Sequence, residues 1–95
     1  MITSKTNELI KHIKNLHNKK YRDEYNEFFV EGIKFVQEAI NEKMEIIKII
    51  VCEEIFKEKI DLSNYDVEYV NESVFKYISD TMTPQGILAV IKKKI

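Results

Sequence analysis

Apolar side chains recur at helical spacing near the start of this chain and in strand-like runs further along. Leu9, Ile13 and Leu16 occupy the i, i+4 and i+7 positions that share one face of a helix, and Asn7 stands where a helix cap is needed. The polar stretch at 18–23 follows as a charged helix end or a loop. The pattern therefore predicts an amphipathic N-terminal helix whose basic side chains face solvent.

The remainder of the chain alternates between short apolar runs and amphipathic segments. β-Branched and aromatic residues mark the expected strands. In order, the expected elements are a strand at 28–30, a helix that Gly32 opens, a strand at 46–52, a short helix at 53–60, a strand at 67–70, a helix that Asn71 caps and a strand at 87–91. The 46–52 strand is expected to be buried on both faces, with Ile55 and Phe56 turned inward from the helix after it. This alternation predicts a layered α/β domain.

Length and composition place the chain among ordinary globular proteins. Its 95 residues suffice for one domain, 1–95, and its 44% apolar and 33% charged content is typical of a folded chain. No apolar stretch approaches the ~20 residues that a membrane-spanning helix needs. Polar residues follow Met1 in place of an apolar signal core, so we expect a cytoplasmic protein in which the lone Cys52 is a reduced thiol.

Charge is distributed unevenly along the chain, although the net charge is only −1. The first 22 residues carry six basic side chains against Glu8 alone, whereas residues 23–95 carry nine basic and fifteen acidic side chains. An asymmetry of this kind is typical of a protein that presents one end to a polyanion. We therefore expect a binding surface at the basic end.

The residue types that usually carry catalysis do not occur at the spacings of known catalytic or metal-binding motifs. A phosphate-binding glycine loop needs several glycines close together, and the two glycines here, Gly32 and Gly86, stand 54 positions apart. His12 and His17 are five positions apart, on different faces of a helix, so we expect surface histidines and no metal site. Cys52 ends an apolar run with no basic neighbour and is expected to be a small core residue. This chain alone is therefore expected to have no catalytic residue.

The segment at 19–22 combines the groups that grip RNA. Lys19 and Lys20 supply point charges, and Arg22 supplies a guanidinium fork. Tyr21 adds a ring on which an unpaired base can stack. The alternative is a solvated helix end with no ligand. We expect these cationic side chains to be exposed, so that their replacement by glutamate abolishes RNA binding without unfolding the protein.

Two turns offer further polar contacts. Gly32 opens a helix directly after a strand, which leaves N–H groups available to a phosphate, unless the glycine only permits a close-packed turn. Glu31 beside it either bonds backbone N–H groups at that helix start or touches RNA. The stretch Thr83-Pro84-Gln85-Gly86 is a rigid polar turn whose hydroxyl and amide can read ribose hydroxyls or base edges, although turn chemistry alone also explains it.

The order and spacing of these pieces resemble a known family. The matching positions are Ser4-Lys5, Asn7, Ile10-Lys11, Leu16, Lys19-Lys20, Arg22, Phe29-Val30-Glu31-Gly32, Val36, Glu38-Ala39, Val74-Phe75, Ile78-Ser79, Thr81 and Thr83-Pro84-Gln85-Gly86-Ile87. Together they resemble the N-terminal domain of SpoU/TrmH-type RNA methyltransferases over nearly the whole chain. Glu8 departs from the proline that family sequences carry near the start, and either residue suits a first helical turn.

The resemblance implies a fold and a function. The implied fold is a three-layer α-β-α sandwich similar to the ribosomal proteins that bind RNA kink-turns. In the family this domain holds the RNA, while a knotted C-terminal domain binds S-adenosylmethionine and methylates a ribose 2′-hydroxyl, commonly in a homodimer. No motif of the knotted domain occurs here, so the chain is expected to be the RNA-substrate-binding domain of an enzyme that continues past Lys92-Lys93-Lys94-Ile95. The catalytic residues and the S-adenosylmethionine site are expected outside this chain.

The expected RNA contacts are Lys5, Lys19, Lys20, Tyr21, Arg22, Gly32, Thr83, Gln85 and Gly86. Ribosomal RNA, and 23S rRNA in particular, is favoured over transfer RNA as the substrate. Two other functions stay open: a stand-alone RNA-binding protein of the kink-turn type, and a protein–protein or dimerisation module. A natural product that ends near Ile95 would favour the first, and salt-insensitive association through exposed apolar residues would favour the second.

Overall fold

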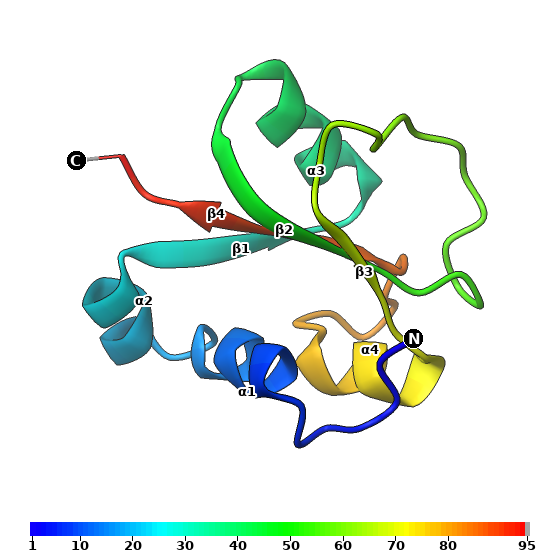
Figure 1. Cartoon of the computed structure of the whole chain (residues 1–95), viewed down its shortest axis with the longest axis horizontal. Helices are drawn as coiled ribbons and strands as arrows, with labels where there is room; N and C mark the ends of the chain where they lie inside the picture. The colour runs from blue at the N-terminus through cyan, green and yellow to red at the C-terminus, as the bar shows by residue number, and fades with distance from the viewer. Residues whose placement is uncertain (95) are drawn as a thin grey trace.

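Strand β4 (Ile87–Lys92) lies inside a four-stranded sheet with the order β1-β4-β2-β3 in the computed structural model, which describes residues 1–94 (Figure 1). Its neighbours β1 (Glu27–Glu31) and β2 (Glu45–Val51) both run antiparallel to it. The short strand β3 (Val67–Tyr69) runs parallel to β2 at one edge of the sheet. Strand β1 forms the other edge.

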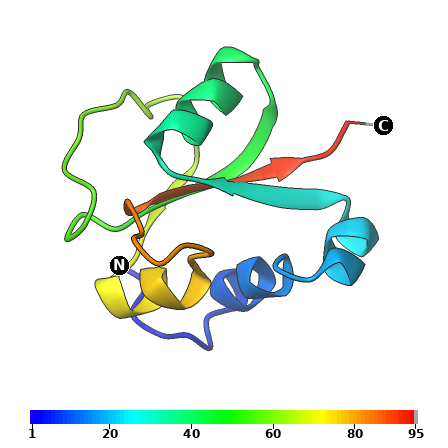
Figure 2. The ribbon, with the colours of Figure 1, turned by 180° about the vertical axis from the view of Figure 1, so that it is seen from behind.

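Helices cover both faces of this sheet, which gives three layers. Helices α1 (Glu8–Asn15) and α4 (Glu72–Ile78) lie side by side on one face. Helix α2 (Lys19–Tyr25) lies at the end of that layer, next to the start of β1, and α3 (Ile33–Asn41) covers the opposite face (Figure 2). No helix within residues 1–94 is long and apolar enough to cross a membrane. The layered α/β fold that the sequence predicts is confirmed.

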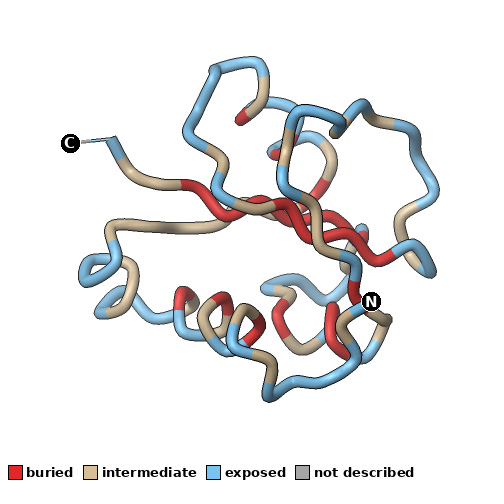
Figure 3. Tube along the Cα trace, in the orientation of Figure 1, coloured by how far each residue is buried: buried red, intermediate tan, exposed pale blue. Residues whose placement is uncertain are grey.

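The side chains of β4 alternate between two hydrophobic cores. Leu88 and Val90 pack in the core that contains α1 and α4. Ile87, Ala89 and Ile91 pack in the core that contains α3, and all five side chains are buried. Figure 3 shows the buried part of the chain running through the middle of the sheet. Strand β4 is therefore covered on both faces.

Strand β2 only partly matches the doubly buried strand that the sequence predicts. Its residues 49–51 are buried, but Ile47 is 38% exposed. A register shift between Ile46 and Lys48 leaves Ile47 without a partner in β4. Strand β3 pairs with residues 49–51 alone, so the first half of β2 lies at an edge of the sheet. The extent of pairing, not the length of the apolar run, decides the burial.

The polar stretch at 18–23 belongs to helix α2, which the sequence left open as a helix end or a loop. The Asn18 side chain caps this helix by accepting the Lys20 N–H at 2.9 Å. Asn26 ends it with φ of 59°, in the left-handed region that asparagine tolerates. Tyr21 is half-buried against the rest of the molecule. The two asparagines, rather than an apolar stripe, define this helix.

The helix expected at 53–60 is wrong. Residues 53–55 form a turn in which the Ile55 and Phe56 amides both donate to the Cys52 carbonyl. Ile55 and Phe56 are half-buried, as expected, but they contact opposite cores. Consecutive side chains of a helix point only about 100° apart, so they do not easily reach opposite faces of a sheet. An irregular connection allows Ile55 and Phe56 to do so.

Substitutions in β4 and β2 distinguish burial on both faces from partial burial. Ile87→Ala and Leu88→Ala each leave a cavity in a different core and should each destabilise the fold by about 2–5 kcal/mol. Ile47→Ala trims an unpaired, half-exposed side chain and should cost less than about 1 kcal/mol. Urea denaturation followed by circular dichroism measures all three free energies of unfolding. A loss for Ile47→Ala as large as the other two would contradict the burial pattern.

Candidate nucleic-acid interface

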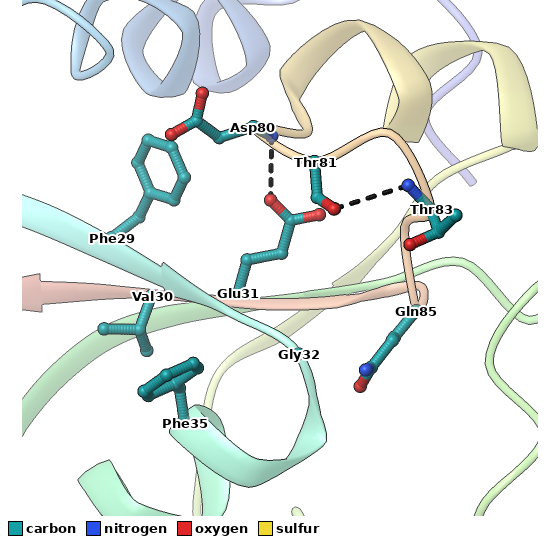
Figure 4. Close-up of a pocket in the computed structure, with 9 residues that line it drawn as sticks. All are labelled: Phe29, Val30, Glu31, Gly32, Phe35, Asp80, Thr81, Thr83 and Gln85. Atoms are coloured by element: carbon teal, nitrogen blue, oxygen red, sulfur yellow. Dashed lines mark hydrogen bonds between the residues drawn. The ribbon is translucent and has the colours of Figure 1, made fainter.

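A groove of about 480 Å³ opens at the free edge of β1, and we call it the edge groove (Figure 4). It lies between the β1–α3 junction and the loop at 80–85 that leads from α4 to β4. Its lining residues are Phe29, Val30, Glu31, Gly32, Phe35, Asp80, Thr81, Thr83 and Gln85. The edge groove brings together the two turns that the sequence singled out separately.

Two histidines attach β1 to the helix layer beneath the edge groove. His12 Nε2 lies 2.7 Å from the Glu27 carboxylate. The His17 ring packs on Phe29 at a centroid distance of 5.0 Å, and its Nε2 donates to the Ile78 carbonyl at 2.8 Å. Both histidines are half-buried, so the expectation of surface histidines is wrong. His12 is in α1, but His17 lies in the turn after that helix, so the expected placement on two faces of one helix is also wrong; contacts with β1 and α4 cover the two rings.

Glu31 fixes one wall of the edge groove. Its Oε1 accepts the Asp80 backbone N–H at 2.8 Å, and its Oε2 accepts the Ser79 hydroxyl. The sequence left open whether Glu31 bonds backbone N–H groups or touches RNA. These contacts match the first of the two roles, which is structural. The N–H that Glu31 bonds follows α4, however, and is not at the start of α3. A half-buried carboxylate with two donors holds the loop after α4 against β1.

Gln85 fixes the other wall. Its side-chain Oε1 accepts the Ile33 N–H at 2.9 Å, so the first turn of α3 has a cap that comes from a residue 52 positions away. The Gly32 N–H donates to the Ile87 carbonyl at 3.0 Å. The expectation that the amides at this helix start are free is therefore wrong for Gly32 and Ile33. Gly32 has φ of 95°, which favours glycine.

Gly86 has a packing role in the turn before β4 and is not exposed to a ligand. It is buried, with φ of 86°, and a Cβ at this position would lie 2.7 Å from the Phe56 nitrogen and 3.0 Å from the Cys52 carbonyl oxygen. The Gly86 carbonyl also accepts the Cys52 N–H at 2.9 Å. These contacts support the alternative of pure turn chemistry, because they leave no side of Gly86 open to a ligand.

The Arg22 side chain stabilises the end of α1. Its Nη1 donates to the carbonyls of Leu16 and His17, each at 2.9 Å, and so satisfies carbonyl groups that the end of α1 leaves free. The side chain is half-buried, which corrects the expectation that the whole basic segment is exposed. A glutamate at this position would break both bonds. Charge reversal of Arg22 therefore cannot separate RNA binding from folding.

The two lysines of α2 remain on the surface. Lys19 Nζ lies 2.6 Å from Asp23, and this hydrogen bond holds the pKa of the Asp23 carboxyl below its ordinary value. Lys20 is exposed, with Nζ 5.5 Å from the centroid of the Tyr21 ring, and the Tyr21 ring stacks on Tyr25. The exposed end of α2 thus carries ammonium groups next to aromatic rings, as the sequence predicts.

A second hollow joins α2 to the edge groove. It encloses about 370 Å³, is lined by Leu16, His17, Arg22, Phe28, Phe29 and Asp80, and shares Phe29 and Asp80 with the edge groove. Four predicted contacts, Arg22, Gly32, Thr83 and Gln85, therefore line one continuous surface along β1. Lys5 is not part of it, since its ammonium group lies over the Tyr77 ring on the helix layer.

Phe35 is a candidate contact that the sequence analysis missed. It stands in the first turn of α3, lines the edge groove and is 55% exposed. The sequence could have indicated this residue, because Phe35 does not lie on the helix face that Ile33, Val36 and Ile40 share. An aromatic ring off the stripe of a helix is available to a ligand.

The charges along this surface differ from one end to the other. The residues that line the edge groove include Glu31 and Asp80 but no lysine or arginine. Hydroxyl, amide and aromatic groups predominate there, which suits a base or a ribose better than a phosphate. The cationic groups stand on α2, beyond the second hollow. The surface can therefore hold a nucleotide at one end and neighbouring phosphates at the other.

Metal and thiol chemistry play no part in these contacts. Residues 1–94 contain no group of three or more His, Cys, Asp or Glu side chains that could hold a metal ion. Cys52 is buried in the core, and this burial raises the pKa of its thiol. The expectation that Cys52 is a core residue is confirmed.

The structure is a three-layer α/β domain with an open groove at the free edge of β1. This chain belongs to the family of MRM3-like substrate binding domains, which it matches over residues 7–89. The expected resemblance to SpoU/TrmH-type RNA methyltransferases is thereby confirmed.

Relatives with names and structures agree with this assignment. The chain is 34% identical to the 23S rRNA (guanosine(2553)-2′-O)-methyltransferase RlmP of Bacillus subtilis strain 168 over 90 residues, 94% of this chain and 36% of the relative. A solved RNA 2′-O ribose methyltransferase superimposes with a TM-score of 0.85 at 26% identity, covering 98% of this chain and 37% of that one. The S-adenosylmethionine-bound rRNA methyltransferase of Sinorhizobium meliloti superimposes with a TM-score of 0.77 at 26% sequence identity. That match covers 98% of this chain and 36% of the other. The chain spans about a third of the length of these relatives.

The two glycines should respond differently to a methyl group. Gly86→Ala forces a Cβ against rigid backbone atoms, in addition to the cost of positive φ, and should destabilise the fold by about 3 kcal/mol or more. Gly32→Ala brings a Cβ to 3.2 Å from the Gln85 Oε1 that caps α3, a side-chain atom that can shift more readily than backbone, and should cost about 1–2 kcal/mol. Thermal or urea unfolding measures both. Equal losses would contradict the assignment of Gly86 as the packing glycine.

Proposed function

We propose that this chain is the RNA-substrate-binding domain of an S-adenosylmethionine-dependent methyltransferase that acts on a ribose 2′-hydroxyl of 23S rRNA. One observation carries the proposal: 94% of the chain aligns at 34% identity with part of a 23S rRNA 2′-O-methyltransferase. The family that it matches is described as a substrate-binding domain. Because RlmP is named for rRNA, the proposal favours ribosomal RNA over transfer RNA.

The methyl donor belongs to the rest of the enzyme in this proposal. A glycine without a Cβ can leave space for a ligand. At Gly32 that space is filled by the Gln85 amide, and at Gly86 it is filled by the turn after Cys52. The described residues therefore offer no glycine cradle for S-adenosylmethionine. We place the cofactor, the catalytic groups and the contacts of a homodimer in a further domain. Ile95, where the resemblance would continue, lies outside the described residues.

Recognition would proceed along the free edge of β1. An unpaired nucleotide enters the edge groove, where its base stacks on Phe35 and its polar edges meet the Thr83 hydroxyl and the Gln85 amide nitrogen. The neighbouring phosphates then lie near α2, where Lys19 and Lys20 stand on the surface. The fixed walls, held by Glu31 and Gln85, leave little conformational freedom to lose on binding.

Lysine and aromatic substitutions test this path. The probe is a fluorescent hairpin of 23S rRNA centred on the position that corresponds to guanosine 2553. Phe35→Ala should weaken binding by about tenfold, because base stacking on an aromatic side chain contributes ~1–3 kcal/mol. Lys19→Glu with Lys20→Glu should weaken it by tenfold or more and make the salt dependence shallower by about two units of log–log slope.

A pair of exposed lysines in the connection between β2 and β3, changed as Lys57→Glu with Lys59→Glu, serves as the control. Fluorescence anisotropy from 50 to 300 mM salt gives affinities and slopes, and melting temperatures report folding. Loss of affinity in the control pair equal to that in the α2 pair would contradict the proposed surface. Failure of the unchanged chain to bind this hairpin or whole 23S rRNA would contradict the proposed function.

A further inference from the structure

Two lysines from different parts of the chain converge on one tyrosine ring. Lys5, in the N-terminal segment, places Nζ 5.4 Å from the centroid of the Tyr77 ring, and Lys14, in α1, places Nζ 4.7 Å from it. Lys14 also donates to the Tyr77 carbonyl at 3.1 Å. We call these three residues the Tyr77 cluster. It lies on the helix layer, away from the edge groove and from α2.

The Tyr77 cluster carries positive charge that the protein does not neutralise. Neither ammonium group pairs with a carboxylate within the part of the chain that the structure describes, whereas Lys11, Lys19 and Lys76 each do. The two ammonium groups lie 5.4 and 4.7 Å from one ring centroid, so they are no more than about 10 Å apart. Two like charges at this separation attract an anion to the nearby surface.

The acidic groups near the cluster already have partners. A shallow hollow beside it is lined by Lys5, Glu54, Glu72, Ser73, Lys76 and Tyr77. The Glu72 carboxylate lies 2.7 Å from Lys76 Nζ, and the Glu54 carboxylate accepts the Glu72 backbone N–H at 2.9 Å. The Glu72 carboxylate is therefore paired with Lys76, and the Glu54 carboxylate is held at the start of α4, so neither forms an ion pair with Lys5 or Lys14.

The C-terminal end of α4 connects the Tyr77 cluster to the edge groove. The Tyr77 carbonyl accepts Lys14, the next carbonyl, of Ile78, accepts His17, and the next two residues bond Glu31 in the groove wall. Figures 1 and 2 show the chain passing from α4 directly into the loop that leads to β4. Four consecutive residues, 77–80, therefore link the Tyr77 cluster to the wall of the edge groove.

We propose that the Tyr77 cluster is a second RNA contact, which binds a phosphodiester of the strand that leaves the edge groove. This inference rests on the proposed function and adds the direction in which the RNA continues. Lys5 and Lys14 donate to the phosphate oxygens, and the Tyr77 ring holds both side chains in place before the RNA arrives. The Ser73 hydroxyl in the adjoining hollow can donate to the same phosphate.

The test removes the two charges and measures the salt dependence of binding to the 23S rRNA hairpin. Lys5→Ala with Lys14→Ala should weaken binding by about tenfold near 150 mM salt and make the log–log slope shallower by about 1.4–1.8 units, because each phosphate contact contributes ~0.7–0.9. Lys57→Ala with Lys59→Ala, which removes two exposed lysines of the connection between β2 and β3, should leave affinity and slope within about twofold of the unchanged chain.

A single variant guards against an effect on folding. Lys14 makes a backbone hydrogen bond, but Lys5 is exposed and makes none among the described residues, so Lys5→Glu should keep the melting temperature while weakening RNA binding several-fold. Normal binding by Lys5→Glu and by the double variant, together with a weakened Phe35→Ala, would overturn the Tyr77 contact and leave the proposed function standing. Absence of binding by the unchanged chain would overturn both.

Discussion

The burial of β4 on both faces is the constraint on which the rest of the structure depends. A strand that places Leu88 in one core and Ile87 in the other must be covered by a helix layer on each side. Antiparallel partners on both sides of β4 then put β1 at an edge of the sheet. The free edge of β1 and the two turns beside it then line the edge groove, which is the proposed binding surface.

Uncharged polar groups and ammonium groups occupy different parts of the surface. The edge groove is held open by two long-range side-chain bonds, from Glu31 and from Gln85, and it offers aromatic, hydroxyl and amide groups. Ammonium groups stand apart from it, on α2 and in the Tyr77 cluster. This separation suits RNA, in which bases carry identity and phosphates carry charge. A fixed groove with cations on either side can orient a nucleotide and hold the strand on both sides of it.

The sequence predicted the elements that depend on local patterns and missed the contacts that depend on distant partners. The β4 run, the α1 stripe and the Asn71 cap were all readable, because periodicity and capping act within a few residues. The helix at 53–60 was wrong because Ile55 and Phe56 serve opposite cores. The exposure of Arg22 was wrong because its partners are carbonyls at the end of α1. The roles of Glu31 and Gln85 depend on residues about 50 positions away, which no local pattern specifies.

The most direct test of the central claim is a map of the bound RNA on the protein. Amide chemical shifts of isotope-labelled protein, recorded during titration with the 23S rRNA hairpin, locate the contacts without any mutation. The account predicts changes along β1 and at Phe35, Thr83 and Gln85, extending to Lys20. Changes that instead gather at β3 and the 53–66 connection, on the opposite edge of the sheet, would contradict it.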